Sequence, residues 1–237
     1  GCNVIDPEDE KPAVIELNKK SLEIIEADQQ FAFELFQQVC SLSAEENIMI
    51  SPLSVSYALG MTYNGADSTT LDAFVDVLHF EGLTEQEVNE SYLDLMGQLV
   101  TLDDRIKLSI ANSIWHVEWA DVLEEFVGKN ETYFDAVVSP LDFSDPASVD
   151  TINEWIEEKT NGKIKDMLDF IPVDAYMYLI NAVYFKASWK YEFDRGETFD
   201  GTFYKSDGSQ TTVDFMALET DLNYAMTEDF TAVELPY

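Results

Sequence analysis

The sequence predicts an α+β fold, in which the helices come first and most of the strands come later. Apolar residues recur at helical spacing through the N-terminal part of the chain, and short strand-like runs separated by turn signals follow Gly196. Helices and strands do not alternate regularly, which argues against a doubly wound parallel sheet. An apolar fraction of 46 % over 237 residues is typical of a globular chain and excludes a disordered one.

The chain is expected to begin with a tether and a long helix. Residues 1–20 are predicted to be a polar tether or linker, because they are mostly polar and contain two prolines. An amphipathic helix is predicted from Ser21 to about Leu42, and Cys40 near its end is expected to be a small buried residue. The predicted apolar stripe of this helix consists of Leu22, Ile25, Phe33, Phe36 and Val39.

A short strand and three further helices are predicted next. Residues 47–50 form a short apolar run, which is expected to be a buried strand. Ser51 and Pro52 are a strong start signal for a helix that stops at Gly65, because serine caps a helix and proline suits its first turn. Two helices are predicted over residues 68–78 and 84–99, and the second begins with a capping box.

Two long apolar strands are predicted in the second half of the chain. Residues 106–117 are apolar or small on both alternating faces, and residues 176–189 are the most apolar stretch, so both strands should be covered on both sides. The pattern between them predicts a helix over 121–133, a short strand over 136–141 and a helix that starts at Asp145–Pro146. The last five residues also have the character of a strand.

Asn181 is the polar residue of most interest in the second long strand. Its neighbours Ile180, Ala182 and Val183 are apolar. A buried amide without partners would cost roughly 1–3 kcal/mol. We therefore expect Asn181 to have hydrogen-bond partners, such as a serine from another element.

The charge of the chain excludes several classes of partner. Lys and Arg number 13 against 47 Asp and Glu, which gives a net charge of −34. Such a surface repels phosphate backbones, so no nucleic-acid binding is expected. The same field disfavours anionic lipids and anionic polysaccharides. No apolar run approaches the ~18 residues of a transmembrane helix.

The sequence offers no recognisable catalytic, metal or cofactor site. His79 and His116 are the two histidines, and no G-x-S-x-G motif presents a nucleophile to them. Ser51 and Ser54 belong to a helix start, where capping is the ordinary role of serine. No His and Cys residues have metal-ligand spacing, and no Gly-rich loop cradles a phosphate. We expect no catalytic residue, no metal ion and no cofactor.

The first two residues, Gly1 and Cys2, match the processing site of a bacterial lipoprotein, where the cysteine carries the lipid and a polar tether follows. The alternative is that the sequence starts at an arbitrary point, with Gly1 left from a tag. The lipoprotein interpretation makes Cys2 a candidate lipid anchor and predicts an extracytoplasmic protein, secreted or held at the cell envelope. The sequons at Asn89 and Asn130 would then be coincidences.

Several blocks of the sequence resemble the serpin family and follow one another in that family's order from about Ser21 to Tyr237. The most specific matches cover the predicted buried strand with the helix after it, the helix that crosses the main sheet, and the third strand of that sheet. The matching residues are Asn47–Met61 with Gly65 and Ala66, Phe134 and Asp135, Ile152–Ile156 with Thr160–Ile164, Leu179–Trp189, Phe215 and Met216, and Glu234–Tyr237.

The resemblance implies a serpin-like fold, with N-terminal helices around a large central mixed β-sheet and smaller sheets beside it. Residues 21–237 would form the N-terminal portion of a single serpin domain, and the reactive loop would lie beyond Tyr237. The implied function is inhibition of a serine or cysteine protease by a monomeric protein, which acts as a trap and not as an enzyme. Cleavage of the reactive loop lets the loop insert into the central sheet as a new strand.

The resemblance also assigns roles to four residues. Ser51, Ser54 and Asn181 match the family's shutter, the polar cluster beneath the point where the sheet opens. Trp189 matches the breach, where the loop first enters. Two other functions remain open: a non-inhibitory serpin fold that serves as a binding or storage protein, and a hydrolase on an unrelated α+β fold. Some serpins bind heparin through basic residues on the helix that matches residues 84–99, which here is acidic, so no heparin binding is expected.

Overall fold

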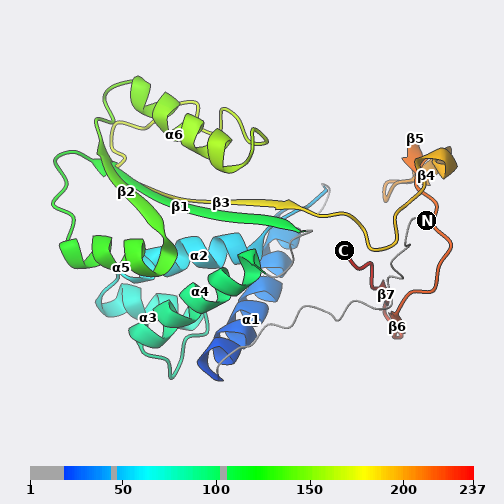
Figure 1. Ribbon diagram of the computed structural model, residues 1–237, viewed down its shortest axis with the longest axis horizontal. Helices are drawn as coiled ribbons and strands as arrows, with labels where there is room; N and C mark the ends of the chain where they lie inside the picture. Colours follow the sequence, from blue (N-terminus) through cyan, green and yellow to red (C-terminus); the bar gives the residue numbers. More distant parts are fainter. Residues whose placement is uncertain (1–18, 44–46, 102–105) are drawn as a thin grey trace, which may run out of the picture. The chain divides into compact units, whose positions relative to one another are not determined.

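The computed structural model describes residues 19–43, 47–101 and 106–237 (Figure 1). The predicted tether and Cys2 therefore lie outside the described residues, except for the last two residues of the tether. The chain divides into two compact units, of which the first ends at Phe185 and the second begins at Lys186.

The first unit contains all of the predicted long helices. Their observed bounds are α1 Lys19–Leu42, α2 Pro52–Tyr63, α3 Ser68–Val77, α4 Glu85–Val100, α5 Glu124–Phe134 and α6 Ala147–Lys159. Ser51 caps α2 and the predicted capping box of Thr84 and Glu87 begins α4, as the start signals indicated. The helix α5 begins three residues later than predicted.

Three strands form a mixed sheet in the order β2-β1-β3. Their bounds are β1 Lys107–Val117, β2 Ala136–Leu141 and β3 Met177–Lys186. β1 and β2 are parallel, with Asn112 opposite Ala136. Contacts between β1 and β3 run in opposite sequence order, because Val117 bonds Tyr176 while Asn112 bonds Asn181, so these two strands are antiparallel.

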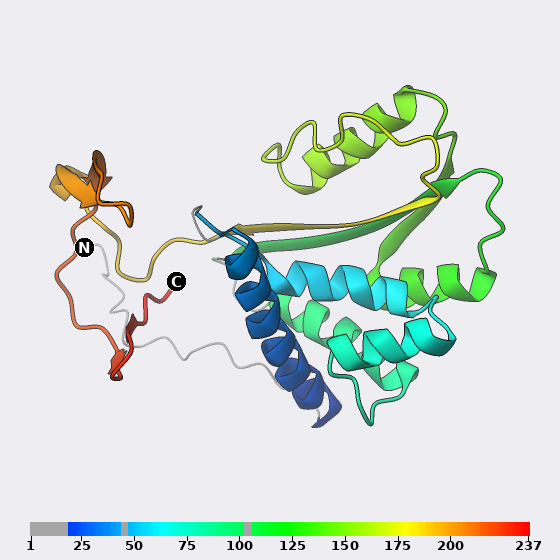
Figure 2. The same cartoon turned by 180° about the vertical axis from the view of Figure 1, so that it is seen from behind.

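Helices cover both faces of this sheet, as the two apolar faces of β1 predicted. Figures 1 and 2 both show α6 on one side of the sheet and α1–α5 on the other. Ile114 of β1 packs into the larger core with these five helices, whereas Trp115 points to the other face and packs with Ile152 and Ile156 of α6. The sheet is thus the middle layer of the first unit.

Aromatic rings fill the core of the helical layer. The rings of Tyr57 and Tyr92 lie 4.9 Å apart between centroids, and Phe134 packs against both. Gly60 lets α2 approach these rings, because a Cβ at this position would come within 3.1 Å of Phe134 and Tyr92. This contact explains the close packing that the sequence predicted for Gly60.

Two predictions about the N-terminal region were wrong. The described residues 47–50 form no strand, and Met49 is 99 % exposed, because no described strand pairs with this segment. On α1 the buried residues are Ser21, Ile24, Ala27 and Phe31, whereas Phe33 of the predicted stripe is 77 % exposed. The helix has two apolar faces, and α2 and α4 cover the one with smaller residues. Cys40 is half-buried.

The second unit consists of short strands, as the turn signals after Gly196 predicted. β4 Phe199–Tyr204 pairs antiparallel with β5 Gln210–Phe215, and β6 Tyr224–Met226 pairs with β7 Thr231–Val233. Gly208 has a φ of +81° in the turn between β4 and β5, a conformation that favours glycine. The residues after Val233 are irregular and not the end of a strand.

Candidate functional site

The start of α2 places a serine against the sheet. Ser51 adopts an extended conformation, and its hydroxyl accepts a hydrogen bond from the backbone N–H of Ser54. Pro52 follows in the first turn, where its missing N–H costs nothing. This cap fixes the first turn of α2 and directs the half-buried Ser54 toward β3.

Ser54, Asn181 and Asn112 form a continuous chain of side-chain hydrogen bonds, which we call the Asn181 cluster. The hydroxyl of Ser54 donates to Oδ1 of Asn181. Nδ2 of Asn181 donates to Oδ1 of Asn112 over 2.7 Å, and Nδ2 of Asn112 donates to the carbonyl oxygen of Phe134 over 2.6 Å. The cluster therefore links α2, β3, β1 and the end of α5.

The end of α5 explains why the carbonyl oxygen of Phe134 needs a side-chain donor. Carbonyl groups in the last turn of a helix lack partners within the helix. Asp135, which follows α5, has a φ of +48° and turns the chain into β2. Asn112 lies beside this turn, because it faces Ala136 in the β1–β2 register. Its amide supplies the missing donor to Phe134, and Asn112 itself is only 2 % exposed.

The Asn181 cluster lies on an outer strand of the described sheet. Within the described sheet, β3 is an outer strand that pairs with β1 on one side. An outer strand offers unpaired N–H and C=O groups to a further strand. Asn181 lies on this strand, and its side chain accepts a hydrogen bond from Ser54 of α2. The cluster therefore ties the outer strand to the helical layer.

Of the five candidate residues that the sequence singled out, the structure brings two into direct side-chain contact, and Cys2 lies outside the described residues. Ser54 and Asn181 are in direct contact, whereas Ser51 contacts the backbone of Ser54 and only supports the contact. Sequence reasoning missed Asn112. The signal was present, because Asn112 is an amide inside an apolar strand in the same way as Asn181.

Trp189 belongs to the second unit, where it lies in a small aromatic cluster. Its ring stacks on Tyr237 with 4.5 Å between centroids and meets Phe193 edge to face. The backbone N–H of the next residue, Lys190, donates to the carbonyl oxygen of Pro236 over 2.9 Å. These contacts join the segment after β3 to the last residues of the chain.

The two histidines lie on different elements and make separate contacts. His79 contacts Glu34 of α1 over 3.1 Å, and His116 contacts the backbone carbonyl of Val117. Among the described residues, no three His, Cys, Asp or Glu side chains are grouped so as to hold a metal ion. Within the same residues, no helix is long and apolar enough to cross a membrane. The asparagines of both sequons are buried, at 1 % and 0 % exposure for Asn89 and Asn130, so neither is accessible to a glycan in this fold.

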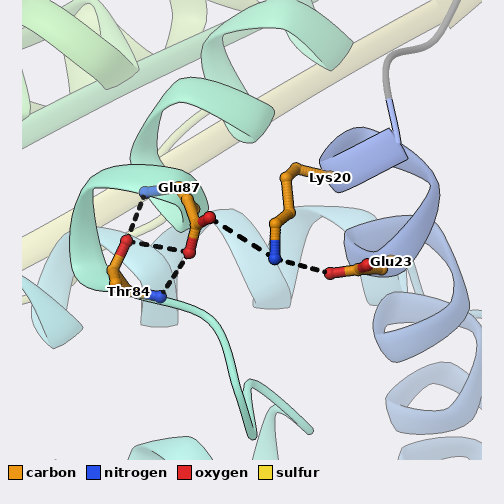
Figure 3. Close-up of polar contacts among 4 residues, drawn as sticks. All are labelled: Lys20, Glu23, Thr84 and Glu87. Carbon is orange, nitrogen blue, oxygen red and sulfur yellow. Dashed lines mark hydrogen bonds and ion pairs between the residues drawn. The ribbon is translucent and has the colours of Figure 1, made fainter.

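Carboxylates dominate the surface around α4. This helix contains no Lys or Arg. Lys20 of α1 reaches Glu87 at its first turn over 3.4 Å and Glu23 over 3.1 Å (Figure 3). Hydrogen bonds from the backbone and hydroxyl of Thr84 lower the pKa of Glu87, and the bond to Glu23 raises the pKa of Lys20. Lys129 of α5 is similarly paired with Glu85 over 2.5 Å.

Comparisons with known proteins agree on one family. A family model described as Serpin (serine protease inhibitor) matches residues 26–237. An uncharacterised serpin-like protein of Methanosarcina acetivorans is 34 % identical over 222 residues, which cover 91 % of this chain and 52 % of the relative. Serpin B4 of Homo sapiens is 31 % identical over 90 % of this chain and 59 % of the relative. The chain thus spans about half the length of the curated relatives it matches.

Solved structures are similar over nearly the same range. Emu ovalbumin matches with a TM-score of 0.85 and 27 % identity, over 91 % of this chain and 60 % of the ovalbumin chain. Cleaved kallistatin, solved in complex with heparin, also has a TM-score of 0.85, with 25 % identity over 92 % of this chain and 65 % of its own.

Proposed function

The chain belongs to the serpin family, and on that premise we propose that the intact protein inhibits a serine or cysteine protease by trapping it. The proposed trap consumes one inhibitor molecule for each protease molecule and does not turn over. Its reactive loop is offered to the protease as a substrate, and the cleaved loop then joins the sheet beside β3. Serpins are themselves a standard example of such strand addition.

The chemistry of the trap would be supplied by the protease. Its serine or cysteine nucleophile attacks the carbonyl carbon of the scissile peptide bond in the loop. The C–N bond breaks, the amine leaves with a proton, and the loop remains bound to the protease as an ester or thioester. Insertion of the loop would carry the attached protease away before water can hydrolyse this bond. No residue of the described chain needs a catalytic role.

The observation that carries the proposal is the Asn181 cluster on the outer strand β3. A strand can enter beside β3 only if this edge of the sheet is available, and premature entry would waste the inhibitor. The hydrogen bond from Ser54 to Asn181 ties β3 to α2 at this edge. We propose that the cluster acts as the shutter, which holds the sheet closed before cleavage. Trp189 would act at the breach, where the loop enters first.

Two further features are proposed for the intact protein. Heparin should not activate it through α4, because this helix is acidic and the neighbouring Lys20 and Lys129 are paired with carboxylates. The protein should also act outside the cytoplasm, secreted or attached to the cell envelope by a lipid on Cys2. In that case Cys2→Ser should move the native protein from the detergent phase to the aqueous phase, and an unchanged partition would refute the anchor.

The test of the proposed function is complex formation with proteases. The intact protein is mixed with a panel of serine and cysteine proteases, and the products are separated on denaturing gels. The account predicts an SDS-resistant complex with at least one protease, which is absent when the protease lacks its nucleophile. Cleavage without any complex would support a non-inhibitory serpin fold that binds or stores a ligand and would overturn the proposed trap.

A further inference from the structure

The side chain of Asp28 on α1 is half-buried where three helices meet. Asp28 reaches from α1 toward α2 and α4, and its Oδ1 accepts a hydrogen bond from the hydroxyl of Tyr92 over 3.1 Å. Its other oxygen, Oδ2, is buried and has no hydrogen-bond partner among the described residues. An unpartnered carboxylate oxygen in such a place is costly as long as the group is charged.

Among the described residues, the groups that act on Asp28 are hydroxyls and no cation is one of them. The titratable groups that face it are Tyr92 of α4 and Tyr57 of α2, and burial raises the pKa of both, so both stay neutral. The hydroxyl of Tyr57 donates to the backbone carbonyl of Tyr92 over 3.2 Å and is not directed at the carboxylate. Ser56 of α2 is a further polar neighbour, and its hydroxyl donates to the carbonyl of Leu53 over 3.2 Å.

These surroundings favour the protonated form of Asp28. Burial raises the pKa of its carboxyl to about 6, although the nearby hydroxyls of Tyr92 and Ser56 act in the opposite direction. A neutral carboxylic acid has an O–H that can donate to Ser56, which would satisfy the orphaned oxygen. Protonation of Asp28 in mildly acidic solution therefore replaces a buried charge with a hydrogen bond between α1 and α2.

Protonation of Asp28 can affect the sheet because α2 contacts both Asp28 and β3. Ser56 lies two residues after Ser54, in the turn of α2 that holds Asn181. We propose that Asp28 is a proton-controlled joint between α1, α2 and α4, which holds α2 and its contact with β3 more firmly in mildly acid solution than at neutral pH. The packing of the three helices carries this inference by itself, and only its effect on sheet opening rests on the proposed function.

The sign of the effect follows from the direction of the shift. The native protein binds the proton more tightly than the unfolded chain, whose Asp has an ordinary pKa of 3.8. The stabilising effect of protonation is fully present below this value, is lost as the pH rises toward about 6, and is absent above it. Over this window the unfolding constant should rise up to about 100-fold, because each pH unit corresponds to about a factor of ten.

The test compares the intact wild-type protein with Asp28→Asn, which keeps the shape of the side chain and removes its charge. Denaturant unfolding from pH 4 to pH 8 should give a wild-type to variant ratio of unfolding constants that rises toward 100-fold near pH 6 and then stays level. Asp72→Asn, at an exposed position of α3, is the matched control and should follow the wild type at every pH. A ratio for Asp28→Asn that does not change with pH would overturn the joint.

Two further measurements test the proposal independently of the unfolding experiment. The carboxyl carbon of Asp28, followed by NMR in the wild type, should titrate near pH 6, and a midpoint near 4 would overturn the proposal even if Asp28→Asn failed to fold. Spontaneous conversion to latent or polymeric forms should be faster at pH 8 than at pH 5 in the wild type and equally slow at both in Asp28→Asn. Both the unfolding and NMR readouts are independent of protease trapping, so they stand or fall separately from the proposed function.

Discussion

Replacing Asn181 with alanine would remove the centre of the Asn181 cluster. The side chain accepts from Ser54 and donates to Asn112, and both bonds are lost in Asn181→Ala. Ser54 is half-buried and can turn toward water, but Oδ1 of Asn112 would be left without a partner on a residue that is 2 % exposed. We therefore expect a loss of about 1–3 kcal/mol of unfolding free energy, of which the orphaned Asn112 carbonyl contributes the larger part.

Because the lost hydrogen bonds lie at the edge of the sheet, Asn181→Ala should do more than lower the melting temperature. Asn181 ties β3 to α2, so its removal should ease opening of the sheet edge and speed the formation of latent or polymeric protein on warming. The cleaved form, in which the loop fills the sheet, should lose less stability than the native form. Thermal melts of both forms and native gels after incubation measure these effects.

A buried asparagine away from the sheet edge provides the control. Asn130 is 0 % exposed and also makes two side-chain hydrogen bonds, to the carbonyl of Phe126 and from Nδ2 of Asn64. Asn130→Ala should lower the melting temperature of both forms alike and leave the polymerisation rate relative to stability unchanged. The reasoning about Asn181 would be refuted if Asn181→Ala destabilised native and cleaved forms equally and formed no additional latent or polymeric species.

The other predictions concern the helical layer. Gly60→Ala should cost about 1–3 kcal/mol of unfolding free energy, because its Cβ would press on the rings of Phe134 and Tyr92; an unchanged denaturation midpoint would contradict this close packing. The second prediction concerns heparin. Because α4 is acidic, the intact protein should pass through a heparin column without salt-sensitive retention, and a variant with Gln86, Glu90 and Asp94 of α4 all changed to lysine should be retained. Tight, salt-sensitive retention of the wild type that survives charge changes outside α4 would contradict the second prediction.

Local signals predicted most of the elements because each signal reflects a contact that the structure contains. Ser51 caps α2 and Thr84 forms the capping box of α4, so both helices begin at the predicted residues. The two apolar faces of β1 were recognised because helices do cover both. Such signals depend only on neighbouring residues or on the alternation of a single strand, and a sequence displays both directly.

The errors arose where a distant partner decides the structure. The run at residues 47–50 has the composition of a buried strand, but a strand needs a neighbour with which to pair, and no described strand provides one. The stripe on α1 was misplaced because two of its faces are apolar, and periodicity cannot say which face α2 and α4 will cover. Ala27 lies on the covered face, where a small side chain permits close approach.

The candidate site was only partly predictable for a similar reason. The demand that Asn181 find a partner followed from its apolar neighbours, and the structure supplies Ser54. Asn112 became visible only through the pairing of β1 with β2 and β3, which brings it between Asn181 and the end of α5. The sequence predicted the end of α5 to within one residue, but it does not show which distant side chain donates to the carbonyl of Phe134.

Hydrogen–deuterium exchange of β3 tests most directly whether this edge of the sheet accepts a new strand. The backbone amides of residues 177–186 would be compared in the intact native protein and after a protease has cleaved its reactive loop. We expect the amides of β3 to gain protection after cleavage, because the inserted loop would pair with the edge of β3 that lies opposite β1. Unchanged exchange along β3 in a fully cleaved protein would contradict this expectation.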